Sequence, residues 1–160
     1  MTQKPHKPQS GLPARRSAVW MLGKVLSEGR LLSELIGQGG LDHLNTADRA
    51  RAQRLASAVL RYLPVSDALL DPHLRRAPPD DVLNVLRLGA VELAMGAAAH
   101  GVVNDLVTLV SRSKRHARLK GLVNAVLRKL PETAQDVWQS MTPPELPEWL
   151  RGPLIDAWGS

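Results

Sequence analysis

Apolar residues recur at helical spacing along most of this chain, and this pattern restricts the possible folds more than any other feature. In the clearest segment, from Thr46 to Leu63, they fall at i, i+3, i+4, i+7, i+8 and i+11: Ala52, Leu55, Ala56, Val59, Leu60 and Leu63. Residues at these steps share one face of an α-helix. We expect Thr46 to cap this helix and Pro64 to end it.

The same spacing predicts further helices along the chain. They are expected over residues 14–28, 31–36, 82–95, 102–113 and 118–130, with a short one that Ser66 would cap. Residues 82–95 are apolar nearly all round, which is typical of a buried central helix. No segment has the alternation and turn residues of a β-hairpin. The sequence therefore predicts an all-α protein, in which about six or seven helices form one bundle.

The 160 residues divide into three segments of different character. Residues 1–12 combine Lys, Pro and Gly without apolar periodicity, which predicts a disordered basic arm. Residues 13–131 hold the periodic segments and form the predicted helical domain. Residues 132–160 are interrupted by prolines and carry three Trp residues that would be exposed unless another surface covers them: Trp138, Trp149 and Trp158. We interpret this last segment as a linker toward a further domain.

The composition excludes several kinds of chemistry. The chain has no Cys, so disulfides, thiolate metal ligands and a Cys nucleophile are impossible. No two of its five His residues have the i, i+4 spacing of a helical zinc site. We expect no catalytic residue, metal site or cofactor site in this chain. Its apolar runs are too short to span a bilayer, and its start lacks a signal-peptide core, which predicts a cytoplasmic protein without a membrane partner.

Positive charge is concentrated in the body of the chain. Residues 1–130 hold 20 Lys or Arg and 10 Asp or Glu, whereas residues 131–160 hold 1 and 5, so the two parts carry +10 and −4. A basic surface attracts polyanions, and nucleic acid is the leading candidate for such a partner. The alternative is that the charge serves solubility alone.

Two clusters of cations supply the candidate contact residues, and a third set lies on the third expected helix: Arg51, Arg54 and Arg61. Between Val110 and Leu130 there are seven Lys or Arg and no Asp or Glu, and three polar residues follow one line at four-residue steps: Lys120, Asn124 and Arg128. Arg15 and Arg16 oppose the dipole at the start of the first helix, which favours a role in binding a partner. The candidate RNA-binding residues are Arg15, Arg16, Arg112, Lys114, Arg115, Arg118, Lys120 and Arg128. The sequence leaves open whether their faces are contiguous.

Several ordered blocks resemble the NusB-like helical domain over residues 14–131. The blocks are RRSAVWMLGKVLSEGRLLSEL near the start, RLASAVLRYL at 54–63, VLRLGAVELAMG at 85–96, VVNDLVTLVSR at 102–112 and KGLVNAVLRKL at 120–130. The resemblance implies the same all-α bundle. The chain departs from the family pattern at Ala98–Gly101, where a Pro often precedes the His, and at Asp105, where the family has Glu.

The resemblance covers two classes of protein. One class is the free-standing transcription antitermination factors. In the other, this domain precedes the catalytic half of 16S rRNA cytosine-5 methyltransferases of the RsmB (Sun/Fmu) type. Three features favour the second class: Leu127-Arg128 in place of Leu-Asp, the sequence from Ala58 to Arg61, and the segment from Leu146 to Leu150, which is similar to the entry into that catalytic half.

Resemblance to the second class implies that RNA binding and catalysis belong to different domains. Its reaction uses a Cys nucleophile and S-adenosylmethionine on a Rossmann-like sheet, and this sequence has neither the Cys nor a strand and Gly-rich turn for the cofactor. We therefore expect a non-catalytic RNA-binding domain whose partners are ribosomal RNA and a C-terminal methyltransferase domain that holds S-adenosylmethionine. A NusB-type antitermination factor and a protein-interaction module are the alternatives.

Overall fold

The computed structural model describes residues 10–140, which we call the described residues. They form helices and contain no strand, which confirms the predicted all-α class. The helices are α1 (Leu12–Glu28), α2 (Leu32–Gly37), α3 (Thr46–Arg61), α4 (Leu63–Leu70), α5 (Asp80–Ala94), α6 (Ala99–Ser111), α7 (Lys120–Lys129) and α8 (Pro131–Ser140), with short 3₁₀ helices η1 (Asp71–His73) and η2 (Ala117–Leu119).

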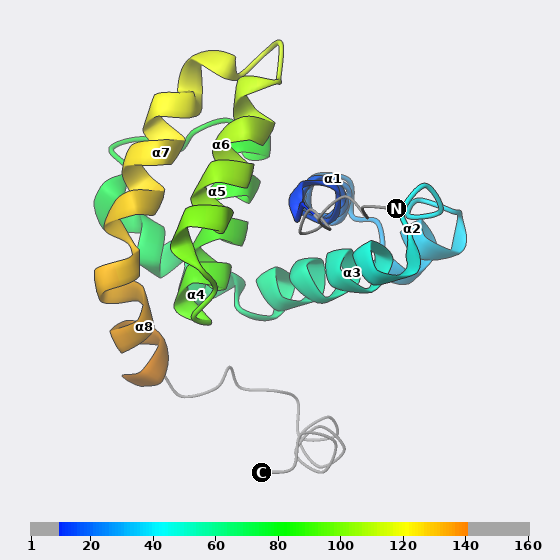
Figure 1. Cartoon of the computed structure of the whole chain (residues 1–160), viewed down its shortest axis with the longest axis horizontal. Helices are drawn as coiled ribbons and strands as arrows, with labels where there is room; N and C mark the ends of the chain where they lie inside the picture. Colours follow the sequence, from blue (N-terminus) through cyan, green and yellow to red (C-terminus); the bar gives the residue numbers. More distant parts are fainter. Residues whose placement is uncertain (1–9, 141–160) are drawn as a thin grey trace, which may run out of the picture.

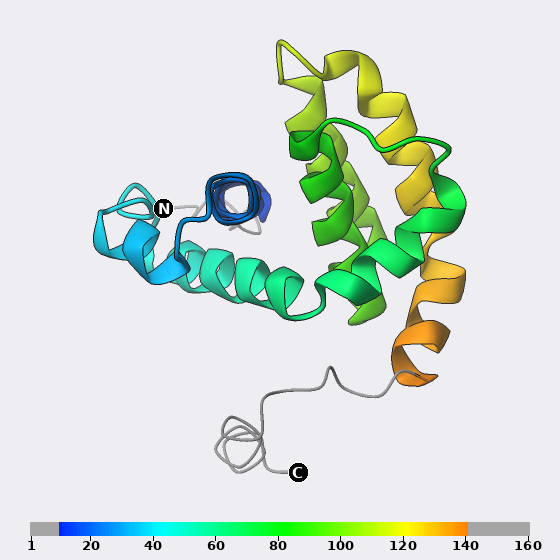
Figure 2. The ribbon, with the colours of Figure 1, turned by 180° about the vertical axis from the view of Figure 1, so that it is seen from behind.

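Helix α5 is the centre of the bundle. It packs against α1, α3, α4, α6, α7 and α8, and most of its residues are buried, as its apolar sequence predicts. Figures 1 and 2 show α1, α2 and α3 grouped on one side and α4 to α8 on the other. Because α5 contacts both groups, the buried side chains form one continuous core from Ala14 to Ala134.

A glycine lets the central helices approach closely. A Cβ atom added at Gly89 of α5 would lie 2.5 Å from Cδ2 of Leu127 in α7 and 3.1 Å from Cδ1 of Leu106 in α6. Both leucines are fully buried. The absence of a side chain at Gly89 therefore sets the distance at which α5 meets its two neighbours.

Two of the predicted helix caps are wrong. Asn45 caps α3, because its Oδ1 accepts a hydrogen bond from the backbone N–H of Asp48 at 2.8 Å, and Thr46 is the first helical residue. Ser66 lies inside α4, where its hydroxyl donates to the carbonyl of Leu63 at 2.8 Å. A proline in the first turn of α4 suits a position whose N–H needs no partner, so that helix starts earlier than expected.

The expected linker begins instead as a helix. Residues 131–140 form α8, in which Ala134 is fully buried. The rings of Trp138 and Tyr62 meet with their centroids 4.4 Å apart and their planes tilted by 59°. The helical domain therefore extends at least to Ser140. The rest of the predicted linker, with two of its Trp residues, and residues 1–9 of the predicted arm lie outside the described residues.

Candidate nucleic-acid interface

Arg15 is buried, so the prediction that it contacts RNA is wrong. Its side chain is 6% exposed. Its Nε and Nη2 donate to the two carboxylate oxygens of Glu92 in α5 at 2.8 and 3.0 Å, and its Nη1 donates to Asp105 in α6. The two acidic partners lie far along the sequence, so the spacing around Arg15 could not reveal them.

The surroundings of Arg15 keep it charged. Burial disfavours the charged form, but the hydrogen bonds and negative charges of Glu92 and Asp105 outweigh this effect and raise the pKa of Arg15 above its ordinary value. Arg15 therefore connects α1 to α5 and α6 as a permanent cation.

The other seven candidates are exposed at the surface. None of them forms an ion pair with another described residue. We call this set the cationic edge; it consists of Arg16, Arg112, Lys114, Arg115, Arg118, Lys120 and Arg128. Cations without carboxylate partners can neutralise phosphates without first breaking an internal ion pair.

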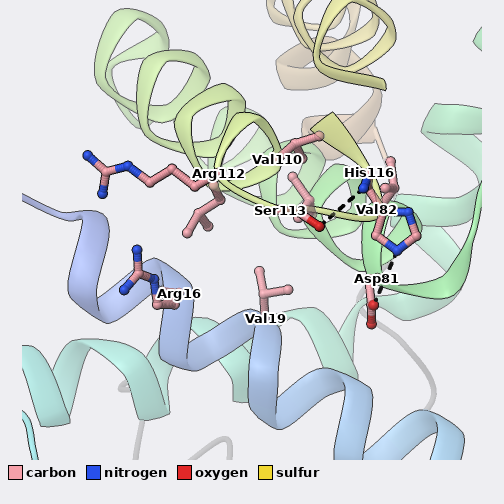
Figure 3. A pocket seen from close by; sticks show the side chains of 10 residues that line it. Arg16, Val19, Asp81, Val82, Val110, Arg112, Ser113 and His116 are labelled. Atoms are coloured by element: carbon pink, nitrogen blue, oxygen red, sulfur yellow. Dashed lines mark hydrogen bonds and ion pairs between the residues drawn. The ribbon is translucent and has the colours of Figure 1, made fainter. Parts of the chain in front are cut away.

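The fold brings two members of the cationic edge together from distant parts of the sequence. Arg16 at the start of α1 and Arg112 at the end of α6 line the same pocket (Figure 3). From Arg112 to Lys120 the chain makes the turn between α6 and α7. Along α7, Lys120 and Arg128 lie two turns apart, roughly 12 Å. The two predicted cationic clusters therefore meet at the pocket between α1 and α6.

A groove between α6 and α7 adds polar groups that the sequence prediction missed. It has a volume of about 420 Å³, and its polar lining consists of His100, Asn104, Asn124 and Arg128. Nε of Arg128 donates to Oδ1 of Asn124 at 3.0 Å. The groove lining contains no carboxylate. The four-residue step from His100 to Asn104 matches the step from Asn124 to Arg128, but only the packing of α6 on α7 brings the two pairs together.

The arginines of α3 are less uniformly exposed than those of the cationic edge. Arg51 and Arg61 are half-buried, and the guanidinium carbon of Arg61 lies 5.5 Å from the ring centroid of Tyr62. Arg54 is exposed. The arginines of α3 therefore differ in environment and do not repeat the arrangement seen around α6 and α7.

Ser17 and His43 form a serine–histidine pair that lacks the features of a nucleophilic site. The hydroxyl of Ser17 lies 3.2 Å from Nε2 of His43, but Ser17 is buried. No described carboxylate forms a hydrogen bond with His43 to orient its ring as a general base. Across residues 10–140, no three His, Asp or Glu residues gather as a metal ion would require. No helix in that range has the length and apolar character needed to cross a membrane.

Comparisons with known proteins agree with the resemblance read from the sequence. The NusB family model matches residues 12–132. The chain is 40% identical over 114 residues to ribosomal RNA small subunit methyltransferase B of Thermus thermophilus, covering 69% of this chain and 26% of that protein. It is 31% identical over 160 residues to the protein of the same name from Xanthomonas campestris pv. campestris, covering 94% and 35%.

These curated relatives are much longer than the chain, which spans about a quarter to a third of their length. No solved structure matches it significantly. The family match runs from the first residue of α1 into the start of α8 and so includes the central helix, the α6–α7 turn and the cationic edge. The chain belongs to the NusB family.

Proposed function

We propose that this chain is an RNA-binding accessory domain of an rRNA cytosine-5 methyltransferase, and that it is not catalytic by itself. Its family membership and its two relatives named as small-subunit rRNA methyltransferases support this assignment. The domain would hold ribosomal RNA while a neighbouring methyltransferase domain carries out the reaction.

The observation that carries the proposal is the cationic edge beside a groove without carboxylates. Lys and Arg side chains neutralise phosphates and release counterions, which supplies affinity with little regard to sequence. The amide groups of Asn104 and Asn124 in the groove can bond to sugar and phosphate oxygens. Contacts of this kind fix the position of an RNA and leave the choice of base to other contacts.

The described residues do not fit the methyl donor. The described residues contain no strand, so they provide no Rossmann-like sheet for S-adenosylmethionine. The sequence contains no Cys to attack a cytosine ring. We place both the cofactor and the nucleophile in the partner methyltransferase domain.

The salt dependence of RNA binding tests the proposal. Fluorescence anisotropy with a labelled fragment of ribosomal RNA would be measured for the wild-type chain and for the triple variant Lys114→Glu, Arg115→Glu, Arg118→Glu. We expect the slope of log K against log salt to become shallower by about 2–3 in the variant, because each lost phosphate contact removes roughly 0.7–0.9.

A second triple variant controls for net charge. Lys24→Glu, Arg30→Glu and Arg54→Glu change the net charge by the same amount, but these residues lie on α1, in the turn before α2 and on α3, and none of them lines the pocket or the groove. This control should keep most of the wild-type slope. Equal losses in the two variants, or no binding by the wild type, would contradict the proposal.

A further inference from the structure

The pocket that Arg16 and Arg112 line lies between α1, α5 and α6. Its volume is about 280 Å³. Its apolar lining comes from three helices and consists of Val19, Val82, Val85, Leu109 and Val110. A cavity of this size is near the lower end of small-molecule pockets, so it suits one nucleotide-sized group and is too small for a helix of a protein partner.

The rim of this pocket is polar, and its positive and negative side chains lie on different sides. Figure 3 shows Arg16 and Arg112 on one side and Asp81 with His116 on the opposite side. The two arginines come from different helices and form no ion pair with a described carboxylate. The carboxylate of Asp81 faces His116, and its Oδ2 lies 3.5 Å from Nε2 of that residue. The cationic side of the rim is therefore available to an anion.

Ser113 provides a further polar group at the rim. Its Oγ accepts a hydrogen bond from the backbone N–H of His116 at 3.2 Å, and the hydroxyl proton remains available as a donor. The pocket thus offers an apolar floor, a hydroxyl group and two guanidinium groups. A nucleotide presents the matching groups: a flat base with polar edges attached to a phosphate.

We propose that this pocket receives one unpaired nucleotide of the bound RNA, with its base on the apolar floor and its phosphate against Arg16 and Arg112. The inference rests on the proposed RNA-binding function and adds to it a preference for RNA with an unpaired nucleotide. A base within a duplex is stacked and cannot enter a pocket, whereas a bulged or single-stranded base can. The domain should therefore distinguish RNA with an unpaired nucleotide from fully paired RNA.

Two labelled hairpins test this preference: one fully paired, and one with the same stem and a single bulged nucleotide. We expect the wild-type chain to bind the bulged hairpin about 5–10-fold more tightly, the effect of burying the apolar surface of one base. Two variants would fill the pocket without changing its charge: Val19→Phe from the floor and Ser113→Phe from the rim. Both should lose the preference and keep the wild-type affinity for the paired hairpin.

Val25→Phe is the matched control, because Val25 is also a half-buried valine of α1 but does not line the pocket. It should keep the preference. Thermal unfolding would establish that all three variants are folded, and Ser113→Phe provides the test if Val19→Phe does not fold.

The outcomes separate the two proposals. If the wild type binds both hairpins equally, or if a folded pocket-filling variant keeps the preference, the pocket inference is overturned and the RNA-binding function stands. If neither hairpin binds at low salt, both are overturned. In methyl-labelled protein, the bulged hairpin should shift the methyl signals of Val19 and Leu109 more than the paired hairpin does. Equal shifts with the two hairpins would overturn the pocket inference.

Discussion

Arg15 and Arg16 are adjacent in the sequence but have different environments. Successive residues on a helix point about 100° apart, and in α1 this turns Arg15 toward the core and leaves Arg16 at the surface. Arg15 is buried and bonded to Glu92 and Asp105, whereas Arg16 is exposed at the pocket rim. Substitutions at the two positions should therefore separate stability from RNA binding.

We expect Arg15→Met to lower the free energy of unfolding by about 3–5 kcal/mol, because it leaves the carboxylates of Glu92 and Asp105 without their cation in a buried site. Urea denaturation followed by circular dichroism would measure the loss. Arg16→Met is the matched control and should change stability by less than about 0.5 kcal/mol. Similar losses in the two variants would contradict the structural role of Arg15.

The difference in free energy of unfolding between the wild type and Arg15→Met should also stay constant as the pH rises through the alkaline range. A raised pKa means that the charge of Arg15 contributes its full stabilisation below the pKa in the unfolded chain and loses it only as pH rises through the folded value. Both values lie above the alkaline range in which unfolding is measured. Urea denaturation at about pH 8 and about pH 10 should therefore give the same difference between wild type and variant. A difference that disappears at the higher pH would show that burial lowers the pKa of Arg15 into this range, which contradicts the raised pKa.

At the scale of the elements, the positions of the long helices could be predicted but not all of their ends. The apolar spacing in α3 and α7 is set by the core, so the sequence displays it directly. The cap of α3 depends on a competition between the neighbours Asn45 and Thr46, which spacing does not decide. Helix α8 was missed because few of its residues are apolar, and its contact with Tyr62 comes from a distant part of the chain.

Because α5 lies so close to α7 at Gly89, even a methyl group at this position should destabilise the protein. Gly89→Ala should lower the free energy of unfolding by about 1–2 kcal/mol, since overpacking against Leu127 and Leu106 exceeds the gain in helix propensity. Urea denaturation would measure this loss. Gly23→Ala in α1 is the control, because its added methyl group meets no atom within 4 Å, and it should stabilise the protein by up to about 1 kcal/mol. A stabilising Gly89→Ala would show that the core adapts without strain.

The contact between α8 and the end of α3 can be measured as a pairwise energy. A double-mutant cycle with Tyr62→Leu and Trp138→Leu should give a coupling of about 0.5–1.5 kcal/mol, the usual range for aromatic pairs. The measurement is the free energy of unfolding of the wild type, both single variants and the double variant. A coupling near zero would mean that the two rings do not stabilise the attachment of α8.

At the scale of the whole molecule, the sequence predicted where cations concentrate but not which faces meet. The run from Arg112 to Lys120 is on the surface as expected. The pocket that joins Arg112 to Arg16, and the groove that joins His100 to Arg128, each combine residues from different helices. Such neighbours depend on how the helices pack, and no local pattern in the sequence encodes them.

The central position of α5 predicts that the bundle unfolds as one unit. Trp20 in α1 and Trp138 in α8 lie in helices that both pack against α5, so each should report the same cooperative transition. Two variants would retain only one of these tryptophans, with the other three Trp residues replaced by Phe. In each variant, the denaturation midpoints from tryptophan fluorescence and far-ultraviolet circular dichroism should coincide. An earlier fluorescence midpoint in the variant that retains Trp138 would instead mean that α8 detaches before the core unfolds, because that probe senses α8 whereas circular dichroism reports all the helices.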